Sequence, residues 1–271
     1  MSDKVKPFLK WAGSKYKIID RITASLPPGN RLIEPFVGSG AVFLNTNYSE
    51  YIVADSNADL IGLYNCLKTQ GVEFIQSTQQ LFSPEHNQPE SFYSLRAEFN
   101  QTLDIHRKAS IFVYLNRHCF NGLCRYNGSG KFNVPFGRYT KPSFPEFEMT
   151  SFLHKAQSVN FKVADFIDTM NMAESGDVVY CDPPYVPLSK TANFTGYTKA
   201  EFTLVHQQQL SEAAIKLMEK GVSVVISNHD TEFTRMIYDQ AKIHYFDVQR
   251  FISSNAETRV KAPELLAIFS K

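Results

Sequence analysis

The run Asp182-Pro-Pro-Tyr185 carries the strongest chemical signal in this sequence of 271 residues. It directly follows Asp177-Val-Val-Tyr-Cys181, which predicts a buried strand, and ligands of open α/β sheets bind beyond the carboxyl ends of strands. The Asp182 carboxylate and the Pro183 carbonyl, which the next proline holds rigid, can each accept one hydrogen of an adenine amino group. The lone pair of that nitrogen would then point at an incoming electrophile. The tyrosine face offers a stacking surface for a base turned out of a duplex, whereas a stiff turn would explain only the proline pair.

A second candidate ligand site is the run Pro35-Phe-Val-Gly-Ser-Gly40, which follows a short apolar run. The next predicted strand ends in Asp55. A glycine turn after one strand and an acid after the next fit a ligand with an amino-acid tail and a ribose, whose hydroxyls the acid would bind. A helix N-cap is the alternative role for Asp55, in competition with Ser56 and Asn57. The sequence has neither a complete GxGxxG fingerprint nor a GxxxxGK(S/T) run, so it does not indicate nucleotide phosphate binding.

Basic and aromatic residues alternate between Ile105 and Pro145, a segment with seven Lys or Arg and no Asp or Glu. A solvated surface normally mixes both signs, so this segment predicts phosphate contacts and base stacking with a nucleic acid. The formal net charge of the chain is only +1, and any nucleic-acid footprint must therefore be local. The basic residues are Arg107, Lys108, Arg117, Arg125, Lys131, Arg138 and Lys141, and the aromatic residues among them include Tyr114, Phe120, Tyr126, Phe132, Phe136 and Tyr139.

Two further runs give weaker signals. Phe8-Leu-Lys-Trp-Ala-Gly-Ser-Lys15 holds the only tryptophan between two lysines, and taken alone it favours a segment that packs on the domain with solvated lysines. Near the end of the chain, Arg250, Arg259 and Lys261 surround the polar run Ser253-Ser-Asn255 and are candidates for additional phosphate contacts.

The elements that must position these residues follow the order of a doubly wound α/β domain, with strand, glycine turn, helix, strand and acid. The predicted strands are residues 31–34, 51–55, 159–163, 177–181 and 222–226, with 243–248 and 264–269 as an antiparallel pair that closes the sheet edge. The predicted helices are residues 41–45, 57–68, 201–220 and 231–240.

An inserted module interrupts this pattern. Residues 71–116 have apolar side chains at helical spacing, and residues 121–139 predict a β-hairpin or a long loop with Gly128-Ser-Gly130 at its tip. The α/β pattern resumes near Pro145. We therefore divide the chain into a ligand-binding catalytic domain, residues 1–57 and 145–271, and a nucleic-acid recognition domain, residues 58–144.

The composition is that of an ordinary soluble globular protein, with 20% charged and 13% aromatic residues. The sequence shows no apolar run long enough for a bilayer and no secretory h-region. We therefore expect a cytoplasmic protein that binds no membrane and has no obligate protein partner. The four cysteines form no CxxC pair, and no histidines stand at zinc spacing. We expect reduced thiols and no metal.

These runs together resemble the DNA adenine methyltransferase (Dam) family over essentially the whole chain. The order of motifs is also that of the family, with the cofactor motif first, then the recognition insertion and the catalytic motif. The matching runs are Phe8-Leu-Lys-Trp-Ala-Gly-Ser-Lys-Tyr16, Glu34-Pro-Phe-Val-Gly-Ser-Gly40, Leu115-Asn-Arg117, Asn121-Gly-Leu-Cys-Arg-Tyr-Asn127, Phe132-Asn-Val-Pro-Phe-Gly-Arg-Tyr139, Asp182-Pro-Pro-Tyr185, Thr191-Ala-Asn-Phe194 and Ile226-Ser-Asn-His-Asp230.

The resemblance implies a Rossmann-like fold and methyl transfer from S-adenosylmethionine to adenine N6 in double-stranded 5′-GATC-3′, by base flipping and direct in-line transfer. Such an enzyme would act on DNA in a bacterial cell or a phage-infected host. In the catalytic run, Asp182 would bind the amino group and the cofactor region, and Tyr185 would stack on the flipped adenine. The residues implied in cofactor binding are Trp11, Lys15, Pro35, Phe36, Gly38, Ser39, Gly40, Asp55, Asp165, Phe166 and Asp182, and the catalytic run also contains Pro183 and Pro184.

The resemblance also assigns residues to DNA. Arg125 would read a guanine, in keeping with the bidentate geometry of Arg–guanine pairs. Phe120 would insert into the stack where the adenine leaves, and Lys10 would contact a base edge. Leu123, Pro135 and Tyr139 would read or pack against the other bases, and the DNA-binding set further includes Arg117, Asn121 and Arg138.

Other acceptors and a non-catalytic role are the alternatives. Cytosine amino groups, RNA and protein amides are possible acceptors, but the family pattern places Ser instead of Asp182 for cytosine and Asn for a glutamine amide. Methylation at cytosine carbon needs a thiolate in a Pro-Cys pair, which this sequence lacks. A non-catalytic DNA-binding protein predicts a broken catalytic run or glycine turn, and both are intact.

Overall fold

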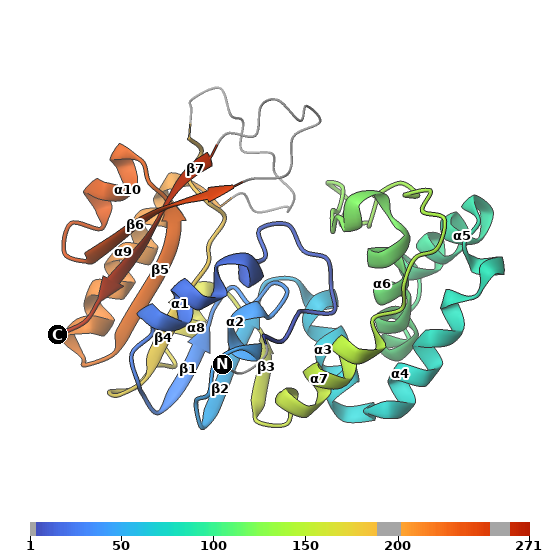
Figure 1. Cartoon of the computed structure of the whole chain (residues 1–271), viewed down its shortest axis with the longest axis horizontal. Coiled ribbons are helices and arrows are strands. Elements are labelled where there is room, and N and C mark those ends of the chain that lie inside the picture. The colour runs from blue at the N-terminus through green and yellow to red at the C-terminus, as the bar shows by residue number, and fades with distance from the viewer. Residues whose placement is uncertain (1–3, 189–201, 250–260) are drawn as a thin grey trace.

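A parallel sheet extended by an antiparallel pair forms the centre of the larger part of the molecule (Figure 1). The computed structural model describes residues 4–188, 202–249 and 261–271, and within these ranges the strand order is β3-β2-β1-β4-β5-β7-β6. The strands are β1 (Arg31–Glu34), β2 (Glu50–Asp55), β3 (Val159–Val163), β4 (Val178–Cys181), β5 (Ser223–His229), β6 (Lys242–Gln249) and β7 (Lys261–Phe269). The predicted doubly wound sheet and its antiparallel pair are confirmed.

The direction of winding reverses between β1 and β4. These two strands are parallel neighbours, with β2 and β3 on one side of them and β5 on the other. Such a reversal leaves a crevice at the carboxyl ends of the strands, where ligands of this class of fold bind. Residues 35–40 follow β1 and Asp182 follows β4, so both predicted ligand runs lie at this crevice.

Helices pack on both faces of the sheet. In β4, Val178 and Tyr180 belong to one apolar cluster, whereas Val179 and Cys181 belong to a second cluster on the other face. A strand covered on both faces needs an apolar side chain at every position, which explains the continuous apolar run in the sequence. The helices beside the sheet are α1 (Ile19–Ser25), α2 (Ala41–Leu44), α3 (Ala58–Gln70), α7 (Glu146–Ala156), α8 (Phe166–Met170), α9 (Leu204–Glu219) and α10 (Glu232–Ile237).

A helical module lies at one end of the sheet, to the right in Figure 1. It contains α4 (Val72–Gln79), α5 (Pro89–Phe99) and α6 (Ile105–His118), which confirms the predicted helical spacing. Helix α3 contacts both α6 and the strands β2 and β3, and one apolar cluster contains Phe99 and Phe112 of the module together with Val53 of the sheet. The module and the sheet therefore share one core.

Residues 121–139 form a long loop. Only two isolated bridges join its arms, Cys119 with Phe136 and Tyr126 with Phe132. Its tip is closed by backbone bonds, since Asn127 and Gly130 donate to Lys131 and Asn127 carbonyls. Of the two structures that the sequence left open, the long loop is the one observed.

None of the helices described here is long and apolar enough to cross a bilayer. Within the same ranges, no three His, Cys, Asp or Glu side chains are arranged to hold a metal ion.

Candidate active site and nucleic-acid interface

The Asp182 carboxylate is held by two side chains from distant parts of the chain. Its Oδ1 atom lies 2.8 Å from Lys15 Nζ and accepts a hydrogen bond of 3.1 Å from Ser227 Oγ. Burial raises the pKa of Asp182, while the Lys15 ammonium and the Ser227 hydroxyl oppose that rise. The structure thus brings Lys15, a predicted cofactor residue, directly against the predicted catalytic acid.

Tyr185 is fixed on three sides. Lys15 Nζ lies 4.5 Å from the centre of its ring, the edge of His229 packs at 4.8 Å between centroids, and the hydroxyl donates to Glu264 Oε2 at 3.3 Å. A cation near a tyrosine ring and an aromatic edge contact both favour one ring orientation. The ring can therefore serve as a preformed stacking surface.

The glycine turn after β1 is tied to the acid after β2. The Asp55 carboxylate accepts hydrogen bonds from the backbone N–H of Gly38 at 3.1 Å and of Asn57 at 3.0 Å. Burial raises the pKa of Asp55, and these two N–H groups oppose the rise. Asn57 is the N-cap of α3, since its Oδ1 accepts from Leu60 N at 3.1 Å. The capping alternative for Asp55 is thus wrong, and its carboxylate instead joins the turn to the second strand.

Trp11 packs on this turn. Gly38 has a positive φ of 46°, and a methyl group there would lie 2.9 Å from Trp11 Nε1. Only glycine allows the indole to approach so closely. Ser39 Oγ lies 2.9 Å from Ser14 Oγ, which is a second link between the N-terminal run and the turn. The predicted cofactor residues Trp11, Gly38 and Ser39 are therefore neighbours.

An aromatic cluster borders the same turn. Phe36 and Phe166 stack with ring centroids 5.6 Å apart, and Phe202 packs its edge against both. Asp165 is the N-cap of α8 and accepts from Ile167 N at 2.9 Å, with its side chain exposed. Sequence reasoning missed Phe202, because nothing in its local pattern distinguishes it from a core residue.

Glu34 is a further titratable group at the site, quoted in the sequence only as part of a motif. It is 2% exposed, and its Oε1 atom has no partner among the residues that the structure describes. Burial raises the pKa of Glu34 well above 4.5, and the nearby Asp182 charge adds to the rise. Burial thus favours the protonated form of this side chain, which lies under the crevice.

Lys10, Asn121 and Tyr139 meet where the N-terminal run touches the loop. Lys10 Nζ lies 4.5 Å from the centre of the Tyr139 ring, and the Tyr139 hydroxyl accepts from Asn121 N at 2.9 Å. The buried Asn116 side chain accepts from Lys10 N at 2.9 Å and donates to the Lys10 carbonyl at 2.7 Å. Burial lowers the pKa of Lys10. These three predicted DNA-binding residues form one connected group.

The other loop residues predicted to meet DNA line the same segment. Phe120 is 50% exposed, and its N–H donates to the carbonyl of the exposed Pro135 at 2.9 Å. Arg125 Nε donates to Asn133 Oδ1 at 2.8 Å, which holds the half-buried guanidinium across the loop. Leu123 is half-buried, and Arg138 is exposed with a positive φ of 53°.

Arg117 is a correction to the DNA-binding set. It is 8% exposed, and its Nη2 atom donates to the Phe8 carbonyl inside the protein. Helix α6 turns this position toward the N-terminal run, so the guanidinium does not reach the surface as a phosphate contact requires. The basic residues around Arg117 in the sequence suggested that it lies on the surface. A pattern of charges does not show which side chains of a helix point into the protein.

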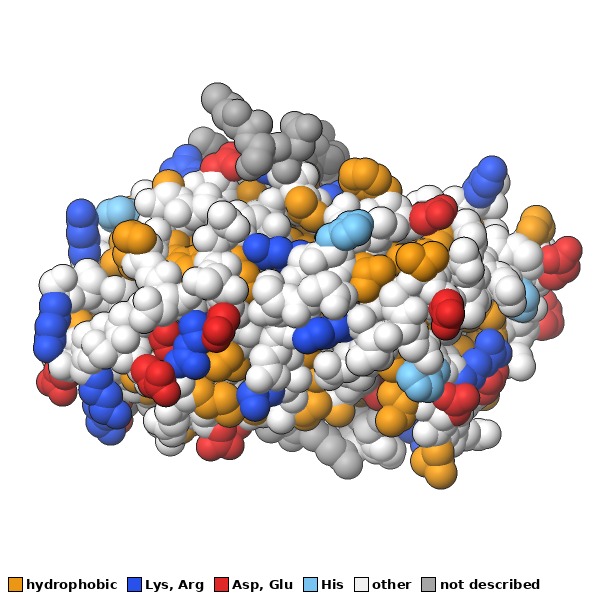
Figure 2. All heavy atoms as spheres, turned by 90° about the horizontal axis from the view of Figure 1, so that it is seen from below, with side chains coloured by type: hydrophobic (Ala, Val, Ile, Leu, Met, Phe, Trp, Pro, Cys, Tyr) orange, Lys and Arg blue, Asp and Glu red, His pale blue; other side chains and the backbone are white. Residues whose placement is uncertain are grey.

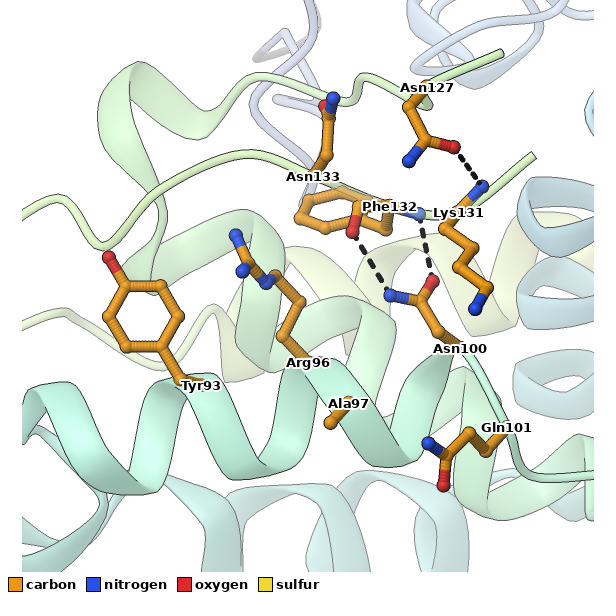
Figure 3. Close-up of a pocket in the computed structure, with 9 residues that line it drawn as sticks. All are labelled: Tyr93, Arg96, Ala97, Asn100, Gln101, Asn127, Lys131, Phe132 and Asn133. Carbon is orange, nitrogen blue, oxygen red and sulfur yellow. Dashed lines mark hydrogen bonds between the residues drawn. The ribbon is translucent and has the colours of Figure 1, made fainter. Parts of the chain in front are cut away.

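A pocket of about 290 Å³ lies between α5 and residues 127–133 (Figure 3). Asn100 Nδ2 donates to the Phe132 carbonyl at 3.1 Å, and Asn100 Oδ1 accepts from Phe132 N at 2.8 Å. Arg96 Nη1 donates to the Val134 carbonyl at 2.9 Å, so the cavity wall also supports the loop. Its lining residues are Tyr93, Arg96, Ala97, Asn100, Gln101, Asn127, Lys131, Phe132 and Asn133.

The face in Figure 2 carries both signs of charge among apolar side chains, as is typical of a solvated surface. Acids from outside the segment of residues 105–145 also pair with two of its basic residues, Arg107 with Glu98 and Lys108 with Asp59. Thr191-Ala-Asn-Phe194, Ser253-Ser-Asn255, Arg250 and Arg259 lie outside the described residues, as does the side chain of Lys261.

Known proteins are similar to this chain in sequence over nearly its whole length. A family model described as D12 class N6 adenine-specific DNA methyltransferase matches residues 11–252. The chain is 53% identical over 266 residues to the DNA adenine methylase of Escherichia coli strain K12, which covers 98% of this chain and 96% of that protein. It is 52% identical over 267 residues to that of Serratia marcescens, with coverages of 98% and 99%, and 49% identical over 269 residues to that of Haemophilus influenzae, with coverages of 98% and 94%.

Proposed function

The chain belongs to the D12 class of N6 adenine-specific DNA methyltransferases, and we propose that it methylates double-stranded 5′-GATC-3′ with S-adenosylmethionine as the methyl donor. The observation that carries the proposal is the Asp182 carboxylate, held by Lys15 and Ser227 beside Tyr185 at the crevice between β1 and β4. The relatives named DNA adenine methylases come from bacteria, and we infer that this enzyme likewise works on cytoplasmic DNA.

The residues around the glycine turn fit S-adenosylmethionine. Asp55 keeps lone pairs free beyond its two backbone bonds and would accept the ribose hydroxyls. Trp11 and the turn of residues 35–40 would enclose the methionine portion, with Lys15 beside it. Phe166, which is buried against Phe36 beside the exposed Asp165, would border the cofactor's adenine. When bound, the cofactor supplies an electrophilic methyl group on a sulfonium.

The catalytic run would orient the target amino group. Asp182 Oδ1 is engaged by Lys15 and Ser227, and Oδ2 has no partner among the described residues. We propose that Oδ2 accepts one amino hydrogen and the Pro183 carbonyl the other, so that the nitrogen lone pair points at the methyl group. The positive charge that develops on the nitrogen then lies beside a carboxylate, which stabilises it. Transfer is direct, and no protein nucleophile takes part.

Base flipping brings the adenine to this place. Tyr185 would stack on the flipped base, because its ring is already fixed by Lys15 and His229. Phe120, half of whose surface is exposed, would fill the gap left in the duplex. Unstacking is an energetic cost, and an inserted aromatic side chain offsets part of it.

In this proposal, residues of the long loop 121–139 recognise the DNA sequence. Arg125 would donate to guanine O6 and N7, with its fork presented across the loop by Asn133. Lys10, Leu123, Pro135 and Tyr139 would contact the remaining bases. Asn121, whose backbone is bonded to Tyr139, and the exposed Arg138 would contact the DNA backbone.

The test measures transfer of a labelled methyl group from S-adenosylmethionine to two matched duplexes, one with GATC and one with those bases scrambled. Transfer to the GATC duplex alone is the expected result. Transfer to both duplexes would discard the assignment of the reading residues. Transfer to neither, with DNA still bound, would instead favour a non-catalytic DNA-binding protein.

A further inference from the structure

Three fully buried polar side chains lie behind the catalytic run. Gln207 of α9, Asn228 of β5 and Tyr238 just after α10 each have 0% of their surface exposed. Burying amide and hydroxyl groups destabilises a protein unless each finds a hydrogen-bond partner. The hydrogen-bond partners of these three side chains therefore indicate which part of the structure they hold in place.

The cluster binds the backbone of the catalytic run. Gln207 Nε2 donates to the Pro184 carbonyl at 2.7 Å, and Gln207 Oε1 accepts from Asn228 Nδ2 at 2.9 Å. Asn228 Oδ1 accepts from Val186 N at 3.1 Å, and Asn228 Nδ2 also donates to the Tyr238 hydroxyl at 3.1 Å. The two linked amides thus hold one backbone atom of the run and one of Val186, the residue that follows it.

Two further contacts from β5 complete the support. His229 Nδ1 lies 2.5 Å from the Val186 carbonyl oxygen, and Ser227 Oγ donates to Asp182 Oδ1. Ser227, Asn228 and His229 belong to the run Ile226-Ser-Asn-His-Asp230, to which the proposed reaction gives no direct part. Of its three central residues, Ser227 binds Asp182 within the catalytic run, and Asn228 and His229 bind Val186 directly after it.

The two proline carbonyls of the run differ in their partners. Among the described residues nothing donates to the Pro183 carbonyl, whereas the Pro184 carbonyl is bonded to Gln207. The ring of Pro184 fixes its φ, and the bond from Gln207 fixes its ψ. Because both angles of Pro184 are set, the peptide plane that carries the Pro183 carbonyl is set as well.

We propose that Gln207 is a positioning residue that, held by Asn228, fixes the Pro184 carbonyl and thereby aims the Pro183 carbonyl at the target amino group. This inference rests on the proposed function. An amide suits the task because it donates and accepts at the same time. A glutamate at this position would be acceptor-only when ionised and would repel the Pro184 oxygen.

The experiment compares Gln207→Glu with Gln209→Glu, an exposed position on the same helix. Single-turnover methyl transfer is measured with saturating DNA and cofactor, next to the Kd of each. We expect Gln207→Glu to slow transfer by roughly ten-fold or more at pH 8 with Kd values near those of the parent protein, because orientation is lost and binding is not. Gln209→Glu should transfer at the parent rate.

The pH dependence of the transfer rate distinguishes a loss of positioning from general damage to the fold. Burial raises the pKa of a carboxyl group, so the introduced glutamate should take up a proton on mild acidification and donate to the Pro184 carbonyl again. The rate of Gln207→Glu relative to the parent should therefore recover as pH falls. Equal rates for the two glutamate variants, or a rate deficit independent of pH, would overturn the proposal.

If the Gln207→Glu protein does not fold, a second variant provides the test. Gln207→Met keeps the length and packing without the hydrogen bonds, and it should show the same loss of rate at every pH. Parent-like transfer by this variant would contradict the inference. If the parent protein itself methylates neither duplex, the proposed function fails first, and that outcome is distinct because all rates are expressed relative to the parent.

Discussion

The Tyr126 hydroxyl donates a hydrogen bond of 2.8 Å to Asp59 Oδ2, which joins the long loop of residues 121–139 to the first turn of α3. Lys108 Nζ of α6 lies 2.8 Å from the other oxygen of the same carboxylate. Four residues earlier, Asp55 binds the N–H of Gly38 in the glycine turn. The end of β2 and the start of α3 therefore touch both the proposed cofactor turn and the loop that carries Arg125.

Tyr126→Phe should loosen the loop around Arg125 without removing any predicted base contact. We expect a loss of about 1 kcal/mol in the free energy of unfolding, the usual value of one hydrogen bond. Discrimination between GATC and a duplex with the guanine replaced should fall in single-turnover assays. Tyr245→Phe, at an exposed position, is the control. Unchanged discrimination in Tyr126→Phe would mean that the bond to Asp59 does not position Arg125.

Arg125→Ala should relax recognition of the guanine by roughly 1–3 kcal/mol, the range for a bidentate contact. Competition between the two duplexes measures this directly. Arg138→Ala should instead weaken binding to both duplexes alike, because a backbone contact carries no sequence information. A parent-like sequence preference in Arg125→Ala would remove that residue from the reading role.

Asp182→Ala should abolish methyl transfer while DNA binding persists. The variant loses the acceptor that orients the amino group and the charge that stabilises its developing positive charge, so a drop on the order of 10²-fold to 10³-fold or more is expected. Single-turnover transfer and a gel-shift titration give the two quantities. Measurable turnover near the parent rate would refute the role of this carboxylate.

Glu34→Gln should change how stability depends on pH. Burial raises the pKa of Glu34 well above 4.5, so between pH 4.5 and the folded pKa the folded protein keeps a proton that the unfolded chain has released. The free energy of unfolding of the parent therefore falls as pH rises through that window, by about 1.4 kcal/mol per pH unit. Glutamine has no proton to release.

Denaturant titrations from pH 5 to pH 7, without ligands, measure the effect. The stability of Glu34→Gln relative to the parent should increase with pH across this range. Glu232→Gln, at an exposed helix position, is the matched control and should parallel the parent. Parallel curves for Glu34→Gln and the parent would show that Glu34 titrates as an ordinary carboxyl group.

The central strands β1, β4 and β5 were predictable because they are covered on both faces and therefore have nearly continuous apolar sequences. The helix Glu146–Ala156 was missed, although its buried Met149 and Phe152 lie one turn apart. The sequence also left the form of residues 121–139 open. Side chains such as Asn100 bind that backbone in place of a neighbouring strand, and a contact so far along the chain leaves no local pattern.

The site was predictable in its residue types but not in its connections. Lys15 and Asp182 stand far apart in the sequence, and only the fold brings their side chains within 2.8 Å. Gln207 and Glu34 were missed because a single amide or acid inside an apolar pattern has no signature at sequence level. Arg117 was misjudged for the converse reason, since a charged residue can be buried when a backbone carbonyl receives it.

The core shared by the sheet and the helical module limits how this enzyme can diversify. Helix α3 packs on α6 on one side and on β2 and β3 on the other. Transplanting the module from a relative of different specificity would leave mismatched apolar surfaces along that helix. New recognition should arise more readily through single substitutions on the loop, at exposed positions such as Pro135, where the interior does not have to be rebuilt.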